Sequence, residues 1–176
     1  MPTNNENKHG TGSKTLYLNQ KKKSDWNHKG LTDFQRPLND RGNRDAPMMG
    51  KRLFDKHISI DAFIASPALR AKTTAELIVT ALKKDPAAII FAEELYLAPP
   101  TVFIDIIKKL SNDAASVAIV AHNPGIMEFA GMLTDNRIGI MPTCSIVAVS
   151  AECETWVDFE NAKKQFLFFD YPKANS

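Results

Sequence analysis

Hydrophobic positions along the chain follow two alternating patterns between residues 15 and 133. Short apolar runs predict β-strands, and longer stretches with apolar residues three or four positions apart predict helices. The run SVAIVA is almost entirely β-branched residues and alanine, which is typical of a strand buried on both faces. Strands that alternate with helices predict right-handed βαβ units and a mainly parallel sheet. The predicted strands are 15–19, 61–65, 88–92 and 116–121, and the predicted helices lie within 71–82, 102–110 and 126–133.

Two segments break this alternation. Residues 145–149 and 165–169 are both strand-like and have no helical pattern between them, so a hairpin is predicted there. Residues 39–56 carry apolar positions at helical spacing, but Pro47 would start or kink such a helix. Polar residues dominate both ends of the chain. We therefore expect a disordered tail at 1–14, one domain at 15–171 and a short tail at 172–176.

The composition supports one soluble α/β domain. The chain has 176 residues, 44% hydrophobic and 24% charged, which is ordinary for a globular protein of that size. Lys and Arg number 22 against 20 Asp and Glu, which is too balanced for a protein held to nucleic acid mainly by charge. No apolar run approaches the ~20 residues of a membrane span, and the N-terminus has no apolar signal region. The two cysteines are too few for a disulfide framework and show no zinc-ligand spacing. With no signal region and no membrane span, we expect a cytoplasmic protein.

Residues with candidate chemical roles follow the ends of the predicted strands. This position matters because ligands of open parallel sheets bind beyond the carboxyl ends of the strands. Two of these strands run directly into Ser66-Pro67 and into His122-Asn123-Pro124. Ser66 and Asn123 are favoured N-cap residues, and a proline suits the first helical turn. The amides of a helix N-terminus attract anions.

Several polar and basic side chains accompany these helix starts. Arg70 is placed one turn into its helix, Gln20 and Lys21 end the first strand, and Arg36 lies on a loop that can fold over it. With His122, such a group satisfies the charge and the acceptor oxygens of a phosphate. Taken alone, Arg70 also fits a solvated residue on a polar helix face, and His122 fits a core histidine bonded to a backbone carbonyl.

Four segments, in order, resemble the small phosphohistidine phosphatases of the histidine phosphatase (phosphoglycerate-mutase-like) superfamily: LYLNQKKKSDWNHKGLTDFQRPLNDRG, ASPALRAKTTAE, AHNPG and MPTCSIVAV. The resemblance covers nearly all of 15–171. It implies a three-layer α/β/α sandwich with a mainly parallel central sheet. It also implies removal of a phosphoryl group from protein phosphohistidine through a covalent phosphohistidine, without metal or cofactor. Arg70 and His122 match phosphate-gripping residues of the family, and Arg36 matches an arginine beside the pocket. The implied partner is a phosphorylated protein histidine or a small phosphate ligand.

The first strand departs from this family. Members usually read LVRHAKSDW, whereas this chain reads LNQKKKSDW in the same register. Gln20 replaces the arginine and Lys21 replaces the nucleophilic histidine. A neutral imidazole has a lone pair with which to attack phosphorus, but lysine, with an ordinary pKa of about 10.4, is an ammonium. By this resemblance His122 and Arg70 are expected to be catalytic, with Lys21 at the nucleophile position but not competent. The residues expected to bind phosphate are Gln20, Lys21, Arg36, Arg70, His122 and Asn123.

Three functional interpretations stay open from the sequence. The first is a phosphate-binding family member that is catalytically impaired or inactive. The second is an active phosphatase with an altered first motif, and the third is an interaction domain without enzymatic activity.

The other residues with possible chemical roles receive simpler interpretations. His9 lies in the tail, His28 on an exposed loop and His57 after a helix that it caps; Glu94 has low weight as an acid, and Cys144 is a buried small hydrophobe.

Overall fold

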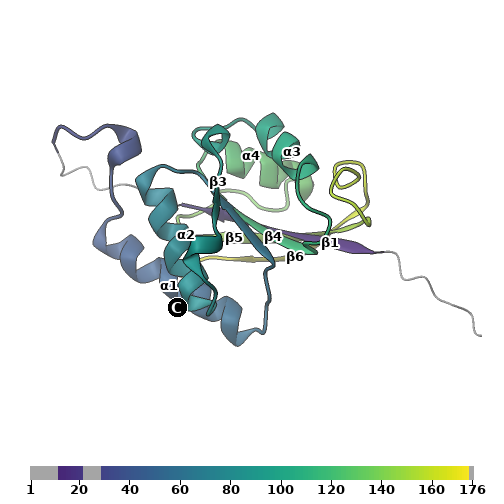
Figure 1. Ribbon diagram of the computed structural model, residues 1–176, viewed down its shortest axis with the longest axis horizontal. Coiled ribbons are helices and arrows are strands. Elements are labelled where there is room, and N and C mark those ends of the chain that lie inside the picture. The colour runs from purple at the N-terminus through teal and green to yellow at the C-terminus, as the bar shows by residue number, and fades with distance from the viewer. Residues whose placement is uncertain (1–11, 22–28, 175–176) are drawn as a thin grey trace, which may run out of the picture.

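The computed structural model describes residues 12–21 and 29–174. It is an α/β fold built around one six-stranded sheet (Figure 1). The strands are β1 (Ser13–Gln20), β2 (Ala62–Ala65), β3 (Ile90–Phe91), β4 (Ser116–Ala121), β5 (Ile146–Glu152) and β6 (Lys164–Asp170). The helices are α1 (Asp40–Asp55), α2 (Leu69–Ala81), α3 (Pro100–Lys108) and α4 (Gly125–Leu133), with 3₁₀ turns η1 (Asp33–Gln35), η2 (Pro86–Ala88) and η3 (Glu93–Leu95).

The sheet has the order β3-β2-β4-β1-β5-β6. The first four strands in that order are parallel, and β5 and β6 are antiparallel additions beside β1. The predicted parallel sheet and the predicted terminal hairpin are both confirmed. β1 and β4 form the centre, paired so that Gln20 lies opposite Ala121.

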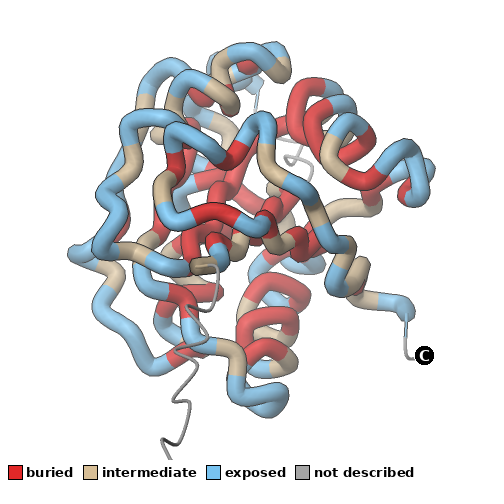
Figure 2. The backbone as a smooth tube through the Cα atoms, turned by 90° about the vertical axis from the view of Figure 1, so that its right-hand side faces the viewer, coloured by how far each residue is buried: buried red, intermediate tan, exposed pale blue. Residues whose placement is uncertain are grey.

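Helices cover both faces of the sheet, which makes the three predicted layers (Figure 1). Side chains alternate across β1: Leu16 and Leu18 pack on the α3–α4 side, and Tyr17 packs on the α1–α2 side. All six residues of β4 are buried, as its composition predicts. In Figure 2 the buried segments run through the middle of the molecule and the exposed ones surround them.

The segment with the unclear pattern forms a single helix, α1, with Pro47 in its interior. Its start is capped by Asn39, whose side chain accepts a hydrogen bond from the Gly42 amide at 3.0 Å. Pro47 removes one backbone donor, but Met49 and Leu53 are buried on the same helix and pack in the core that α1 shares with α2. Tertiary burial therefore keeps the helix continuous.

The predicted helix caps at Ser66 and Asn123 are wrong. The N-cap positions are Ala68 for α2 and Pro124 for α4, and neither makes a side-chain capping bond. Ser66 Oγ still accepts a local hydrogen bond from the Ala68 amide at 3.3 Å, and both polar side chains also have tertiary partners. Ser66 Oγ lies 2.7 Å from His122 Nε2, and Asn123 Nδ2 donates to the Met141 carbonyl at 3.4 Å.

The ordered domain extends further than the predicted 15–171. β1 begins at Ser13, and Lys14 Nζ donates to the carbonyls of Asn112 and Ala114 at 2.6 and 3.1 Å. At the other end, Arg52 donates to the Pro172 carbonyl at 2.8 Å. The rest of the predicted N-terminal tail, residues 1–11, lies outside the described residues. Within the described ranges, no helix combines the length and the apolar character needed to cross a bilayer.

Candidate anion-binding site

Three parallel strands end side by side at one edge of the sheet. β4 lies between β1 and β2, with Ala121 opposite Gln20 and Val120 opposite Ala65. The pairing continues one residue beyond the two outer strands. The Lys21 amide donates to the Ala121 carbonyl at 3.0 Å, and the Ser66 amide donates to the Val120 carbonyl at 3.0 Å. The side chains that follow these strands are thus held at one place.

His122, directly after β4, is buried to 1% exposure. Its Nε2 faces Ser66 Oγ, so the alternative of a backbone carbonyl partner is wrong for this nitrogen. Its Nδ1 is buried and has no hydrogen-bond partner among the described residues. Burial, followed by the charges of Lys21 and Arg70, lowers the pKa of His122 to about 3. The imidazole is therefore neutral at physiological pH.

Arg70, the second residue of α2, is 2% exposed, so the alternative of a solvated helix-surface arginine is wrong. Its guanidinium forms an ion pair with the Asp33 carboxylate at 2.8 Å and also donates to the Asp33 backbone carbonyl. Its Nε is buried without a hydrogen-bond partner in the described part of the chain. The Arg70 guanidinium is thus partly occupied by the Asp33 carboxylate of the same chain.

Asp33 and Tyr96 belong to this site and were not found from the sequence. The Tyr96 hydroxyl donates to Asp33 Oδ2 at 2.6 Å. The Tyr96 ring meets His122 edge-on at 5.5 Å, and the Phe34 ring meets Tyr96 at 5.2 Å. Burial alone would raise the pKa of Asp33, but hydrogen bonds from Tyr96 and Arg70 and the charges of Arg70 and Lys21 lower it. Burial and Asp33 raise the pKa of Tyr96.

The end of β1 contributes Gln20 and Lys21. Gln20 is 5% exposed, and its Oε1 is buried without a hydrogen-bond partner among the described residues. The charge of Lys21 contributes to the lowered pKa of both His122 and Asp33. The backbone pairing puts Gln20 and Lys21 next to the strand that ends directly before His122.

The other candidate residues that the structure describes lie in four different segments of the chain. Arg36 caps the carboxyl end of η1, three positions after Asp33, and is half-buried. Asn123 follows His122, and its Oδ1 is buried without a hydrogen-bond partner among the described residues. Glu94 is exposed on η3 and lines a different hollow. His57 follows α1 in a left-handed conformation, as its predicted capping role requires, whereas His9 and His28 lie outside the described residues.

This arrangement is suited to an anion. The charges of Lys21 and Arg70 both act on the neutral imidazole of His122, and the carboxylate of Asp33 already bonds to Arg70. Buried donors in a poorly hydrated site bind oxyanions strongly. In the ranges that the structure covers, no group of three or more His, Cys, Asp or Glu side chains gathers as metal ligands.

Comparison with known proteins supports the resemblance seen in the motifs. The family model of the histidine phosphatase superfamily (branch 1) matches residues 23–95, beginning just after the altered end of β1. An uncharacterized protein of Mycobacterium tuberculosis is 31% identical over 153 residues, covering 82% of this chain and 94% of that protein.

Solved structures agree with the fold. A putative phosphohistidine phosphatase SixA from Nakamurella multipartitia superposes with a TM-score of 0.76 at 22% identity, covering 93% of this chain and 98% of that one. The protein histidine phosphatase SixA complexed with tungstate gives 0.75 at 20% identity, covering 90% and 97%. With the family model and the mycobacterial relative, this likeness identifies the chain as a member of the histidine phosphatase superfamily.

Proposed function

We propose that this chain binds a phosphoryl group, carried by a protein phosphohistidine or by a small phosphate ligand, and hydrolyses it poorly or not at all. One observation carries the proposal. The side chain at the end of β1, beside His122 and Asp33, is the amine of Lys21 and not an imidazole. The related SixA structures, one of them with the phosphate mimic tungstate, supply the phosphohistidine class of ligand.

Binding is supported by the charges that remain. Arg70 presents a guanidinium fixed by burial, and Lys21 adds a second positive charge, which also acts on His122. His122 is neutral, so it offers one N–H donor without repelling these cations. An oxyanion that binds these groups gains charge-assisted hydrogen bonds.

Loss of turnover follows from the chemistry of the two exchanged side chains. Lysine has an ordinary pKa near 10.4, and a neighbouring phosphate dianion favours its protonated form further. An ammonium has no lone pair with which to attack phosphorus. Gln20 is a neutral amide, so it supplies neither the charge nor the two-pronged grip of an arginine.

The proposal is tested by measuring binding and hydrolysis on the same preparation. We expect saturable binding of tungstate by calorimetry, with no hydrolysis of a phosphohistidine protein or a chromogenic phosphomonoester above background. Arg70→Gln, which keeps polarity but removes the charge, should weaken tungstate binding by at least tenfold. Turnover by the unaltered chain at rates typical of an enzyme would contradict the proposal.

The double change Gln20→Arg with Lys21→His should create hydrolysis of a phosphohistidine protein. It restores both a fixed positive charge and a nucleophilic imidazole at the end of β1, while His122 and Arg70 stay unchanged. The matched control is Gln20→Arg with Lys21→Ala, which restores the charge without a nucleophile and should stay inactive. Equal rates for the two double variants would show that the imidazole is not what the chain lacks.

A second function is favoured by His122 itself. Its imidazole is neutral and its Nδ1 makes no hydrogen bond within the described residues, so this nitrogen has a nucleophile's lone pair or a donor's proton. Hydrolysis through it would form a bond between phosphorus and Nδ1 as the donor's P–N bond breaks, with the leaving nitrogen taking a proton from water. A second water would then break the new P–N bond and release phosphate. Recovery of an acid-labile phosphoryl adduct on His122 after incubation with phosphoramidate would favour this function, and an unlabelled chain would favour binding alone.

A further inference from the structure

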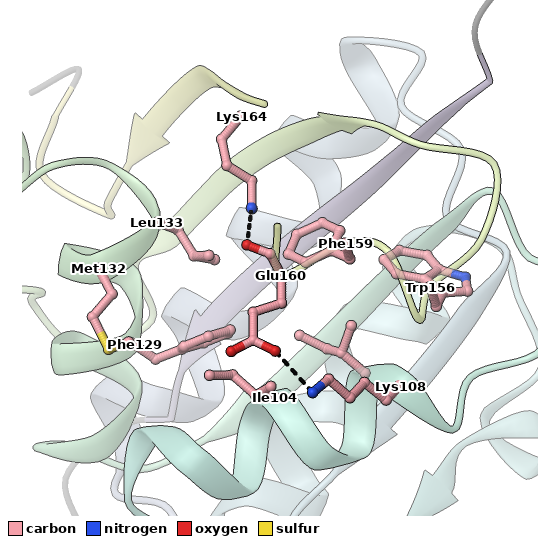
Figure 3. Close-up of a pocket in the computed structure, with 10 residues that line it drawn as sticks. Ile104, Lys108, Phe129, Met132, Leu133, Trp156, Phe159, Glu160 and Lys164 are labelled. Carbon is pink, nitrogen blue, oxygen red and sulfur yellow. Dashed lines mark hydrogen bonds and ion pairs between the residues drawn. The ribbon is translucent and has the colours of Figure 1, made fainter. Parts of the chain in front are cut away.

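A second hollow lies at the opposite end of the molecule from the anion site. It is an apolar slot of about 130 Å³ between α3, α4 and the β5–β6 connection at residues 153–163 (Figure 3). His122 immediately precedes the segment that leads into α4, whereas the slot is lined by Met132 and Leu133 at the far end of that helix. In Figure 1 the yellow-green β5–β6 connection and the dark blue η1 segment lie at opposite ends of the sheet.

The walls of the slot are fixed before any ligand arrives. Trp156 and Phe159 are 0% and 1% exposed, and their ring centroids lie 5.5 Å apart. The Trp156 indole donates to the Ala114 carbonyl at 2.8 Å, and Phe129 stacks on Phe103 at 5.2 Å. Dry apolar cavities of roughly 150 Å³ accept a benzene molecule, so a slot of this size accommodates one ring or a short alkyl chain.

Charged groups stand at the rim of this slot. Glu160 pairs with Lys108 at 2.8 Å, and Lys164 Nζ donates to the carbonyls of Glu160 and Ala162, both at 2.9 Å (Figure 3). The paired side chains of Lys108 and Glu160 are 43% and 41% exposed, and such exposed pairs contribute little stability. The rim can therefore rearrange around an entering molecule at little cost.

A wider groove of about 560 Å³ adjoins the slot and carries an excess of positive charge. The two hollows share Met132, Leu133 and Lys164. The groove adds two exposed cations, Arg137 and Lys163, against one carboxylate, Asp135. Within the described part of the chain, neither Arg137 nor Lys163 has an ion-pair partner.

We infer that slot and groove together form a binding site for a small amphipathic anion, with a ring-sized apolar group in the slot and a carboxylate in the groove. A cation is disfavoured because Lys14 and Lys164 already lie over the rings of Trp156 and Phe159. A neutral molecule fills the slot but gains nothing from Arg137 and Lys163. The inference does not depend on the proposed phosphate site.

Phenylpropionate is the probe that matches this description, and phenylpropanol is its uncharged counterpart. Binding to the full chain is followed by calorimetry and by the fluorescence of Trp156 in a Trp26→Phe background, which leaves Trp156 as the sole tryptophan. We expect saturable binding of phenylpropionate and about three- to tenfold weaker binding of phenylpropanol. No saturable binding of the acid, or equal affinity for acid and alcohol, would overturn the inference.

Two sets of variants locate the site. Ile104→Phe fills the slot and should abolish binding of phenylpropionate. The double variant Arg137→Gln with Lys163→Gln, at exposed positions, should lower the affinity for phenylpropionate to that for phenylpropanol. The matched control is Lys83→Gln with Lys84→Gln, which removes the same charge from the exposed end of α2. Undiminished binding by the Arg137/Lys163 variant, or an equal loss in the control, would contradict the inference even if the slot variant failed to fold.

Discussion

Asp33 occupies the position that an anionic ligand of Arg70 needs. Its carboxylate accepts from the Arg70 guanidinium at 2.8 Å and from the Tyr96 hydroxyl at 2.6 Å. The donors and the charges around it lower its pKa, so the carboxylate is ionised at neutral pH. Asp33 is thus an internal anion bound to Arg70, and under the proposed function a phosphoryl group would compete with it.

Replacing the carboxylate with an uncharged amide removes that competition. We expect Asp33→Asn to raise the affinity for inorganic phosphate by about tenfold, because Arg70 then keeps its charge for the ligand. Calorimetric titration with phosphate measures the change. The effect should shrink as the pH falls through the pKa of Asp33, where the unaltered side chain also becomes neutral.

The control for this prediction is Asp113→Asn, an exposed carboxylate that follows α3 and precedes β4, at the other end of the sheet. It should leave phosphate affinity unchanged. Should Asp33→Asn lower the affinity, Asp33 would be a positioning residue for Arg70 and not a competitor.

Arg70 and His122 could be found from the sequence because each follows a recognisable strand end and each lies in a specific motif. Asp33 and Tyr96 could not. Their mutual hydrogen bond spans 63 positions, and the Asp33–Arg70 pair spans 37. Both residues lie in or beside 3₁₀ turns, where no periodic pattern indicates which way a side chain points.

At the scale of elements, α1 and α2 approach each other closely at Gly50. A Cβ atom built there would lie 2.7 Å from the Ala81 Cβ and 2.9 Å from the Ile78 carbonyl oxygen. These distances are shorter than van der Waals contact, so the helix pair requires glycine at this position. Because α2 carries Arg70, the packing of this pair also positions the anion site.

We predict that Gly50→Ala lowers the free energy of unfolding by about 1–3 kcal/mol through overpacking. Helix propensity acts in the opposite direction, since alanine in a helix interior is favoured over glycine by roughly 0.5–1 kcal/mol. Urea denaturation measures the net sign. Gly139→Ala is the control, because nothing lies within 4 Å of its added Cβ. Unchanged stability in Gly50→Ala would mean that the helices separate without cost.

The predicted bounds of strands and helices agree with the structure where a continuous local pattern marks them, and differ from it where tertiary contacts decide. The strand at 116–121 is confirmed at both ends, because its burial on both faces leaves a continuous apolar signature. The predicted strand at 88–92 shortens to Ile90–Phe91, at the sheet edge where only β2 can pair with it. Pro47 lies within α1 because burial against α2 outweighs one lost hydrogen bond.

At the scale of the whole molecule, burial of His122 couples protonation to folding. In the unfolded chain this histidine takes up a proton below about pH 6.5, whereas the folded pKa is about 3. Unfolding therefore takes up a proton between these values, and stability falls as the pH drops from about 6.5. The slope is about 1.4 kcal/mol per pH unit, or about 2 kcal/mol in total at pH 5.

His122→Gln should remove most of this pH dependence, because glutamine keeps a polar contact for Ser66 and does not titrate. Urea denaturation between pH 7 and pH 5 compares the slopes of variant and unaltered chain. His57→Asn, at an exposed position, should retain the original slope. An unaltered slope in His122→Gln would show that His122 is not buried as a neutral imidazole.

Hydrophobic periodicity by itself determined the succession of strands and helices along the chain, the parallel sheet and the terminal hairpin. The reason is that each element buries one or both faces, and burial requires apolar residues at a spacing characteristic of that element. The motifs placed His122 and Lys21 directly after strands and Arg70 in the helix that follows β2, and the family resemblance identified Gln20 and Lys21 in place of an arginine and a histidine. Only the tertiary structure decided which groups those side chains meet: Ser66 against His122, Asp33 against Arg70, and the apolar slot beneath Trp156. Such contacts join residues distant in sequence, and no local energetic preference encodes them.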